Sequence, residues 1–155
     1  MTDFEDLLSP DGIVYGVAVV TKADLMRTLA AKAGLLSGVD ADIIVDRLNE
    51  REALGTTGFG GGIAIPHGRL PDIDRAFGVF MRLAESIDYQ SVDDMPVDCV
   101  FALFSPVDDG ASHLRALARI SRQFRDRAFV AKLRGARSPD ALFALLAHRE
   151  EADAA

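Results

Sequence analysis

His67 is the side chain in this sequence best suited to react as a nucleophile. It follows a glycine-rich run, residues 56–62, and a short apolar stretch that reaches Pro66. Proline has a fixed φ and no backbone N–H, so a strand is expected to end there, with the imidazole at its terminus and a flexible Gly68 behind it. A neutral imidazole is a competent nucleophile near pH 7. The position suits a histidine that a partner must reach, although the local sequence alone favours a partly buried loop histidine.

Two segments resemble a known protein family. Residues 50–68 (EREALGTTGFGGGIAIPHG) resemble the active-site signature of EIIA proteins of the bacterial phosphoenolpyruvate phosphotransferase system. Within the mannitol/fructose class of EIIA, the sequence is most similar to the nitrogen-related EIIA. Residues 112–120 (SHLRALARI) resemble the segment that carries the family's second histidine at the start of a helix. The resemblance extends from about Leu7 to Ala147.

This resemblance implies a phosphoryl-transfer function for His67. The family accepts a phosphoryl group from a phosphohistidine carrier protein of the HPr type, on the ring nitrogen remote from the main chain, which is Nε2 of His67. The group is then passed on or held as a signal. Transfer between two histidines depends on positioning and charge stabilisation, and the resemblance implies no cofactor.

Two further residues match the family's site. Arg51 corresponds to the arginine of its Glu-Arg-Glu segment, and a guanidinium presents fixed donors to phosphoryl oxygens. The alternative for Arg51 is an exposed helix-end arginine in a weak salt bridge with Glu50 or Glu52. His113 corresponds to the second histidine, and the helix dipole disfavours its protonation. A neutral His113 would donate an N–H to the phosphoryl group or orient His67; alternatively, it has no catalytic role.

The glycine-rich run is a candidate phosphate-binding loop. Thr57, Gly58, Gly60 and Gly62 would let the backbone approach the phosphoryl group, or they form only a connecting loop. The run does not fit a Walker loop or a Gly-x-Gly-x-x-Gly fingerprint, and no Gly-x-Ser-x-Gly elbow is present. The histidines are scattered and lack a zinc-binding spacing, so no metal site is expected.

Composition indicates one cytoplasmic domain spanning residues 1–155, with a frayed acidic tail at about 150–155. The chain of 155 residues is 49% hydrophobic, yet no apolar run reaches the roughly 20 residues of a membrane helix. A formal net charge of -7 argues against nucleic-acid binding. The single cysteine, Cys99, lies in an apolar run and is expected to be buried. His148, near the tail, is expected to be solvent-exposed.

Hydrophobic periodicity and capping residues predict alternating strands and helices. Strands are predicted over residues 13–20, 62–65, 76–83 and 97–104, the last as a central strand covered on both faces. Helices are predicted over residues 22–36, 41–54, 112–125, 129–133 and 139–148, with Thr21, Asp40 and Ser138 as N-caps. Helices before and after a block of strands predict an α/β fold, a three-layer α/β/α sandwich with a central mixed sheet.

Charged residues outside the signature suggest how partners are recognised. Arg115, Arg119 and Arg122 share one helix face, which is either solvated or turned toward an acidic partner. Acidic loop residues are expected near the His67 end of the sheet, where they would steer a basic carrier protein. They are Asp72, Asp74, Asp93 and Asp94.

Three functions remain open from sequence. The first is a nitrogen-related regulatory phosphocarrier. The second is a sugar-specific EIIA that passes the phosphoryl group to the cysteine of an EIIB domain for fructose or mannitol uptake. The third is an EIIA-like binding module without catalysis, against which the presence of Arg51, His67 and His113 argues. The downstream regulatory target carries no sequence signature.

Overall fold

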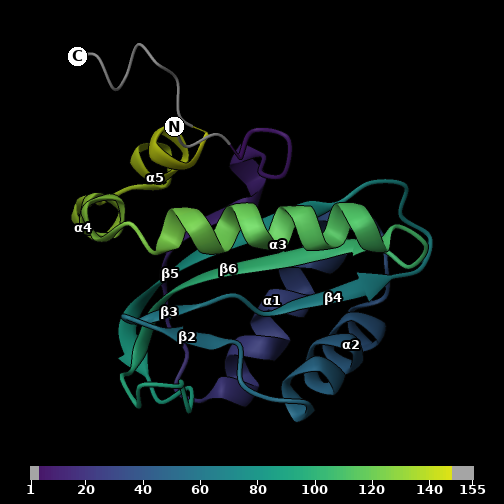
Figure 1. Cartoon of the computed structure of the whole chain (residues 1–155), viewed down its shortest axis with the longest axis horizontal. Coiled ribbons are helices and arrows are strands. Elements are labelled where there is room, and N and C mark those ends of the chain that lie inside the picture. Colours follow the sequence, from purple (N-terminus) through teal and green to yellow (C-terminus); the bar gives the residue numbers. More distant parts are fainter. Residues whose placement is uncertain (1–3, 148–155) are drawn as a thin grey trace.

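A six-stranded mixed sheet organises the computed structural model of the chain, which describes residues 4–147 (Figure 1). Along the sheet the strands follow the order β1-β5-β6-β3-β2, and β4 also pairs with β6. Strands β5 and β6 are antiparallel, whereas β1 is parallel to β5 and both β3 and β4 are parallel to β6. The strands are β1 (Ile13–Val17), β2 (Gly58–Gly60), β3 (Ile63–Ala64), β4 (His67–Leu70), β5 (Phe77–Ile87) and β6 (Val97–Pro106).

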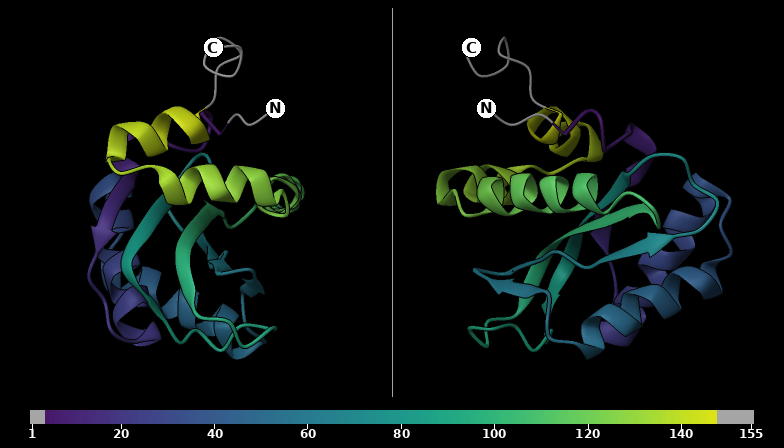
Figure 2. Two further views of the ribbon diagram at one scale, coloured as in Figure 1. Left: turned by 90° about the vertical axis from the view of Figure 1, so that its left-hand side faces the viewer. Right: turned by 45° about the vertical axis from the view of Figure 1, so that its right-hand side comes forward.

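Helices cover both faces of this sheet, α1 and α2 on one side and α3 to α5 on the other (Figures 1 and 2). They are α1 (Lys22–Ser37), α2 (Ala41–Ala53), α3 (Gly110–Phe124), α4 (Arg127–Gly135) and α5 (Pro139–Leu146), preceded by the short 3-10 helix η1 (Pro10–Gly12). The predicted caps Thr21, Asp40 and Ser138 accept hydrogen bonds from backbone N–H groups of the first turns of α1, α2 and α5. The three-layer α/β/α prediction is confirmed.

Strand β6 divides the core in two. Its alternating side chains point to opposite faces. Val100 and Ala102 pack on the side of α1 and α2. Phe101 and Leu103 pack on the side of α3, α4 and α5. Because both faces are covered, the strand is apolar almost throughout, as the sequence predicted for residues 97–104.

Several predicted boundaries are wrong. The first strand ends at Val17, and the strand predicted over residues 76–83 continues to Ile87. The short helix predicted over residues 129–133 is α4, which gains a turn because Asp126 caps it. The last helix ends at Leu146, and His148 and the acidic tail lie outside the described residues.

Strands β2 and β4 were not predicted, and β4 determines how His67 is presented. Pro66 interrupts the predicted strand because it lacks an N–H, but its carbonyl still accepts a hydrogen bond from Leu103 N at 3.0 Å. The chain therefore stays beside β6 and pairs again as β4. Ile63 pairs with Cys99 and His67 with Leu103, so β3 and β4 lie end to end along β6. His67 begins a strand instead of following one.

Within residues 4–147, no helix has the combined length and apolar character needed to span a bilayer. The predicted burial of Cys99 is confirmed, because its side chain is fully enclosed in β6. That burial raises the pKa of its thiol to about 12, so the thiolate form is disfavoured at neutral pH.

Candidate functional site

The ring of His67 is fixed by its own backbone neighbourhood. In β4, Leu70 packs in the core on the side of α1 and α2, and Gly68 lies against Arg47 of α2. The alternation of a strand therefore turns His67 toward α3. Its Nδ1 lies 2.9 Å from the carbonyl oxygen of Ile65. A carbonyl only accepts, so Nδ1 carries the hydrogen and Nε2 keeps its lone pair.

Arg51 reaches the free nitrogen of His67 from the opposite helical layer. It lies in the last turn of α2, and its Nε donates to Nε2 of His67 at 3.1 Å. Its Nη1 also donates to the carbonyl of Gly55 at 2.9 Å, so the guanidinium is held at two points. Among residues 4–147, strand β4 pairs only with β6, so its other edge carries no neighbouring strand.

His113 approaches from the first turn of α3. The centroid of its ring lies 5.4 Å from that of His67, with the ring planes tilted by 52°. Its Nδ1 lies 2.6 Å from the hydroxyl of Ser105 in β6, and the residue is only 6% exposed. The sequence-predicted trio of His67, Arg51 and His113 therefore meets in space, although each residue belongs to a different element.

Burial keeps both imidazoles neutral. The pKa of His67 is lowered mainly by desolvation, and the Arg51 charge lowers it further, while the bond to Ile65 opposes the shift. The pKa of His113 is lowered to about 4 by desolvation, then by the proximity of His67 and Arg69. At neutral pH the site therefore holds two uncharged rings, with the guanidinium of Arg51 beside His67 and that of Arg69 near His113. That arrangement attracts an anionic group and leaves a nucleophilic nitrogen free to attack it.

Comparison with known proteins decides the family. The family described as "Phosphoenolpyruvate-dependent sugar phosphotransferase system, EIIA 2" matches residues 6–149. The chain belongs to this EIIA 2 family. It is 45% identical over 142 residues to the nitrogen regulatory protein of Bradyrhizobium diazoefficiens, covering 92% of this chain and 93% of the relative. It is 35% identical over 128 residues to the nitrogen regulatory protein of Escherichia coli, covering 82% of this chain and 77% of the relative.

Solved structures agree with this assignment. The nitrogen regulatory protein IIA-Ntr of Neisseria meningitidis superposes with a TM-score of 0.86 at 29% identity, over 91% of this chain and 97% of that one. The mannitol IIA of Escherichia coli has the same fold, with a TM-score of 0.74 at 22% identity, over 90% of this chain and 98% of the other. The resemblance predicted from sequence, to EIIA proteins and most closely to the nitrogen-related ones, is confirmed. This EIIA protein is a component of a phosphoryl-transfer system.

Sequence reasoning missed a buried network next to the EIIA site. The carboxylate of Glu52 forms an ion pair with Lys22 at 2.8 Å and accepts from the backbone N–H of Thr57 at 3.2 Å. Its other oxygen accepts from the Thr57 hydroxyl, which also lies 2.8 Å from the hydroxyl of Tyr89. Lys22 sits over the ring of Tyr89, 4.3 Å from its centroid. The signal available was the position of Glu52 beside Arg51.

Arg69 is a second charged residue near the site, and it was not predicted from the sequence. It lies two residues after His67 in β4, so both side chains point to the α3 side of the sheet. Its Nη1 donates to the carbonyl of Val107 at 3.0 Å, and its charge lowers the pKa of His113. The alternation of β4 would have found it, had the strand been predicted.

The candidate phosphate loop is not brought to His67 as a unit. The Thr57 carbonyl accepts from Ile65 N at 3.0 Å, which places its backbone close behind the site, but its hydroxyl is used by Glu52 and Tyr89. Gly58 packs against Tyr89 and Ser91, where any side chain would clash.

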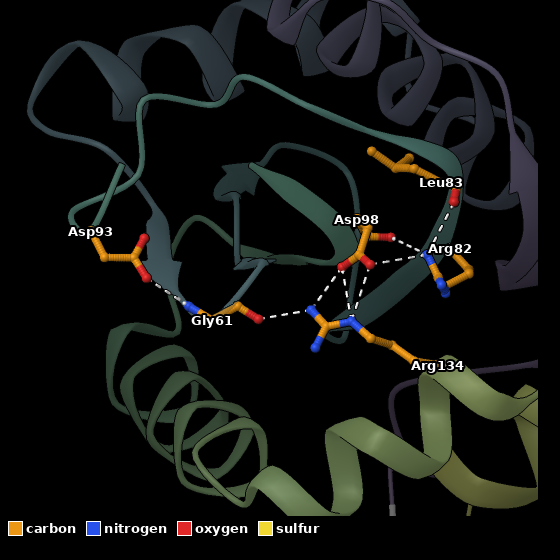
Figure 3. A network of polar contacts seen from close by, with 6 residues as sticks. All are labelled: Gly61, Arg82, Leu83, Asp93, Asp98 and Arg134. Atoms are coloured by element: carbon orange, nitrogen blue, oxygen red, sulfur yellow. Dashed lines mark hydrogen bonds and ion pairs between the residues drawn. The ribbon is translucent and has the colours of Figure 1, made fainter. Parts of the chain in front are cut away.

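Gly60 ends β2, and Gly62 lies in the β2–β3 turn. The register places this turn about 13 Å from His67 along β6. Within the turn, the N–H of Gly61 donates to the carboxylate of Asp93 at 3.0 Å (Figure 3). The anion that this turn holds is therefore a side chain of the protein itself, which favours the alternative of a connecting loop for Gly60 and Gly62.

The other charged residues are separated from one another. Asp93 lies against the β2–β3 turn and not at the His67 end of the sheet, so that expectation is wrong for Asp93. On α3, Arg119 forms an ion pair with Asp6 at 2.9 Å, whereas Arg115 donates to Ser112 within the same helix. Arg122 is exposed. Among residues 4–147, no group of three or more His, Cys, Asp or Glu side chains is arranged to hold a metal ion.

Proposed function

We propose that this protein is a histidine phosphocarrier that acts in nitrogen-related regulation in the cytoplasm. In this proposal, Nε2 of His67 takes a phosphoryl group from the phosphohistidine of an HPr-type carrier protein. The observation that carries the proposal is that the two ring nitrogens of His67 have different contacts. Nδ1–H is bound by the carbonyl of Ile65, whereas the lone pair of Nε2 is directed at Arg51.

The chemical step needs no proton transfer to or from His67. The lone pair of Nε2 attacks phosphorus and forms an N–P bond while the N–P bond of the donor breaks. The bonding electrons leave with the donor nitrogen. The His67 ring becomes a cation that keeps its Nδ1–H, and the Ile65 carbonyl stabilises that charge through the existing hydrogen bond. Because burial lowers the pKa of His67, the nucleophilic form is the resting form at neutral pH.

Arg51 and His113 handle the charge of the phosphoryl group. In the unphosphorylated protein the Nε–H of Arg51 points at the nitrogen that will carry phosphorus. On phosphorylation the same guanidinium turns its donors to the phosphoryl oxygens, because the lone pair it contacted is consumed. His113 is neutral and has its Nδ1 on Ser105, which leaves Nε2 as its remaining polar atom. We assign that atom to the phosphoryl oxygens, where it eases onward transfer.

The surface around the site fits a protein donor. Leu54, Val107 and Leu114 are 83%, 53% and 67% exposed. Each is tied to a site element: Leu54 caps the end of α2, the Val107 carbonyl accepts from Arg69, and Leu114 follows His113. Exposed apolar side chains around a polar centre are typical of protein–protein interfaces, in which a carrier protein would dock.

Delivery to an EIIB cysteine is the second candidate function. The chain is 37% identical over 99 residues to a fructose-specific EIIA component of Haloferax volcanii, which is 64% of this chain and 63% of that protein. The nitrogen regulatory relatives match more of this chain, at 45% identity over 142 residues in the Bradyrhizobium protein, and this favours the regulatory function. Transfer from the phosphorylated protein to purified EIIB domains separates the two functions.

The deciding experiment is phosphotransfer from phosphoenolpyruvate through enzyme I and an HPr-type carrier, followed by intact mass. The expected result is one acid-labile phosphoryl group on the wild type and none on His67→Ala, with circular dichroism to check that the variant folds. His113→Ala should still accept the group and pass it on more slowly. Failure of the wild type to gain mass with several active carriers, or a gain retained by His67→Ala, would refute the proposal.

A further inference from the structure

A cavity of about 440 Å³ lies between the β2–β3 turn and the junction of α3 with α4, away from the phosphotransfer site. Its volume falls in the range of small-molecule pockets, roughly 300–1,000 Å³. Apolar side chains line part of it: Phe59, Ile63, Phe124 and Val130. Phe59 is half-buried, while the other three belong to the enclosed core. Phe59 therefore supplies most of the accessible apolar surface of this wall.

Three arginines stand around this apolar wall: Arg125, Arg127 and Arg134. Arg134 is already engaged, because its guanidinium contacts the carboxylate of Asp98 at 2.8 Å and the carbonyl of Gly61 at 2.7 Å (Figure 3). It fastens α4 to the β2–β3 turn. A Cβ on Gly62 would lie 2.3 Å from Arg134 Nη2, so a glycine is required there for the guanidinium to fit. The glycine run therefore shapes this cavity.

Arg125 and Arg127 have no such partner. Both are exposed, and no residue within 4–147 gives either guanidinium a hydrogen bond or an ion pair. The carboxylate between them in sequence, Asp126, caps α4 through its Oδ1, which accepts from the N–H groups of Ala128 and Phe129 at 3.0 and 3.2 Å, and it forms no ion pair with either arginine.

The other carboxylates close to the cavity are also engaged. Asp98 is shared between Arg134 and Arg82, so two guanidinium groups face one carboxylate. The carboxylate of Asp93 accepts hydrogen bonds from the backbone N–H groups of Gly61 and Met95. Arg134 contacts the carbonyl of the same Gly61 (Figure 3). Neither guanidinium of this rim is therefore paired with a carboxylate among residues 4–147, in a chain whose formal net charge is -7.

We propose that this cavity binds a small organic anion: a flat apolar body against Phe59 and Val130, with a phosphate or carboxylate group held by Arg125 and Arg127. Guanidinium groups bind both kinds of anion through charge-assisted hydrogen bonds, and apolar contact supplies the remaining affinity. The register separates the cavity from His67 by about 13 Å along β6, so the ligand and a carrier protein at His67 do not compete for the same atoms.

The test uses three probes with one ring system: 1-naphthyl phosphate, 1-naphthoate and neutral 1-naphthol. Binding is followed by calorimetry and by amide chemical shifts in ¹⁵N-labelled protein. We expect the affinity of each anion to exceed that of naphthol by about tenfold or more. The shifts should be largest at Gly60, Gly61 and Val130. The same binding should persist in His67→Ala, which separates this cavity from phosphate binding at the transfer site.

Two double variants, each of which removes two positive charges, test where the anionic group of the ligand binds. Arg125→Gln with Arg127→Gln should weaken anion binding about tenfold and leave naphthol unaffected. The matched control is Arg75→Gln with Arg137→Gln, two exposed arginines outside this cavity, and it should change affinity less than about twofold. Equal affinity for all three probes, no shifts at the β2–β3 turn, or unchanged binding in the Arg125/Arg127 variant would overturn the proposal.

Discussion

Arg51 Nε lies 3.1 Å from Nε2 of His67, so the guanidinium contacts the nitrogen we assign as phosphoacceptor before any phosphoryl group arrives. The next residue in the same helical turn, Glu52, points into the buried network with Lys22 and Thr57. At the end of α2, Arg51 thus points to the reacting nitrogen, while Glu52 ties the helix to Lys22 and Thr57. Positioning of this kind reduces the reorganisation that transfer requires.

Replacing Arg51 should slow phosphoryl uptake without removing the acceptor. Arg51→Gln removes the charge that faces the phosphoryl oxygens, and we expect a loss of about 10²-fold in the rate of uptake. Arg51→Lys keeps the charge but loses the planar fork, so its loss should be smaller, about tenfold. Quench-flow followed by intact mass measures both rates. Arg27→Gln, an exposed arginine on α1, is the control. A wild-type rate in Arg51→Gln would remove the residue from the site.

Glu52→Gln should lower both stability and the rate of transfer. The neutral amide cannot form an ion pair with Lys22, and its NH2 group cannot accept a hydrogen bond from Thr57. We therefore expect the free energy of unfolding to fall by about 1–3 kcal/mol. The rate should also fall, because Thr57 and Gly55 set the path of the chain that holds Arg51. Urea denaturation and single-turnover uptake measure the two effects.

A double-mutant cycle separates the ion pair from other effects of the Glu52 substitution. Lys22→Met removes the other partner, and the double variant should lose less stability than the two single losses added together. Strict additivity would mean that the 2.8 Å contact between Lys22 and Glu52 does not stabilise the fold.

Acidification should destabilise the protein through His113. Its pKa is lowered from 6.5 to about 4 in the folded state, so the unfolded chain binds more protons in that interval. The resulting stability is complete above pH 6.5 and is lost as the pH falls toward about 4, with a limiting slope of about 1.4 kcal/mol per pH unit. His67, whose pKa is also lowered, changes stability in the same direction.

The measurement is urea denaturation of wild type and His113→Gln at about pH 7 and about pH 5. The variant lacks the titrating ring, so the difference in stability between the two proteins should shrink at the lower pH. Carboxylates titrate equally in both proteins and cancel in the comparison. A difference that stays constant with pH would show that His113 titrates as it does in the unfolded chain.

Local patterns predicted much of the fold. The caps Thr21, Asp40 and Ser138 act within one helical turn, and the apolar run at residues 97–104 needs only to be buried on both faces. Strand β4 was not predicted, because Pro66 has no backbone N–H and was therefore expected to end the strand. The carbonyl of Pro66 still accepts from Leu103 and keeps the chain on the sheet. Because of that contact, His67 is the first residue of β4, whereas it was predicted to lie at the end of a strand.

The site was predicted by resemblance, since no periodicity joins its parts. Arg51 and His67 are 16 positions apart, one in α2 and the other in strand β4 of the sheet. The position of Glu52 beside Arg51 marks Glu52 in the sequence, but its pairing with Lys22 is not predictable there, because the pairing depends on how α1 and α2 pack. The choice between a phosphate-binding loop and a connecting loop stayed open for the same reason, because the glycines contact side chains from distant segments, namely Ser91, Asp93 and Arg134.

Gly58→Ala tests whether the glycine run serves packing near the site. A Cβ at Gly58 would lie 2.4 Å from Ser91 Oγ and 2.8 Å from Tyr89 Cδ1, too close for either contact to survive. Overpacking of this kind costs about 1–3 kcal/mol. Because Tyr89 also bonds to Thr57, the displacement should reach the Glu52 network and slow phosphoryl uptake as well.

Gly135→Ala is the matched control for this substitution, because no atom lies within 4 Å of its would-be Cβ at the end of α4. Removing a glycine from a helix should leave stability unchanged or raise it by about 0.5 kcal/mol. Urea denaturation of both variants gives the comparison. If Gly58→Ala were as stable as Gly135→Ala yet impaired in phosphoryl uptake, Gly58 would have a direct role at the phosphate, and the packing explanation would be wrong.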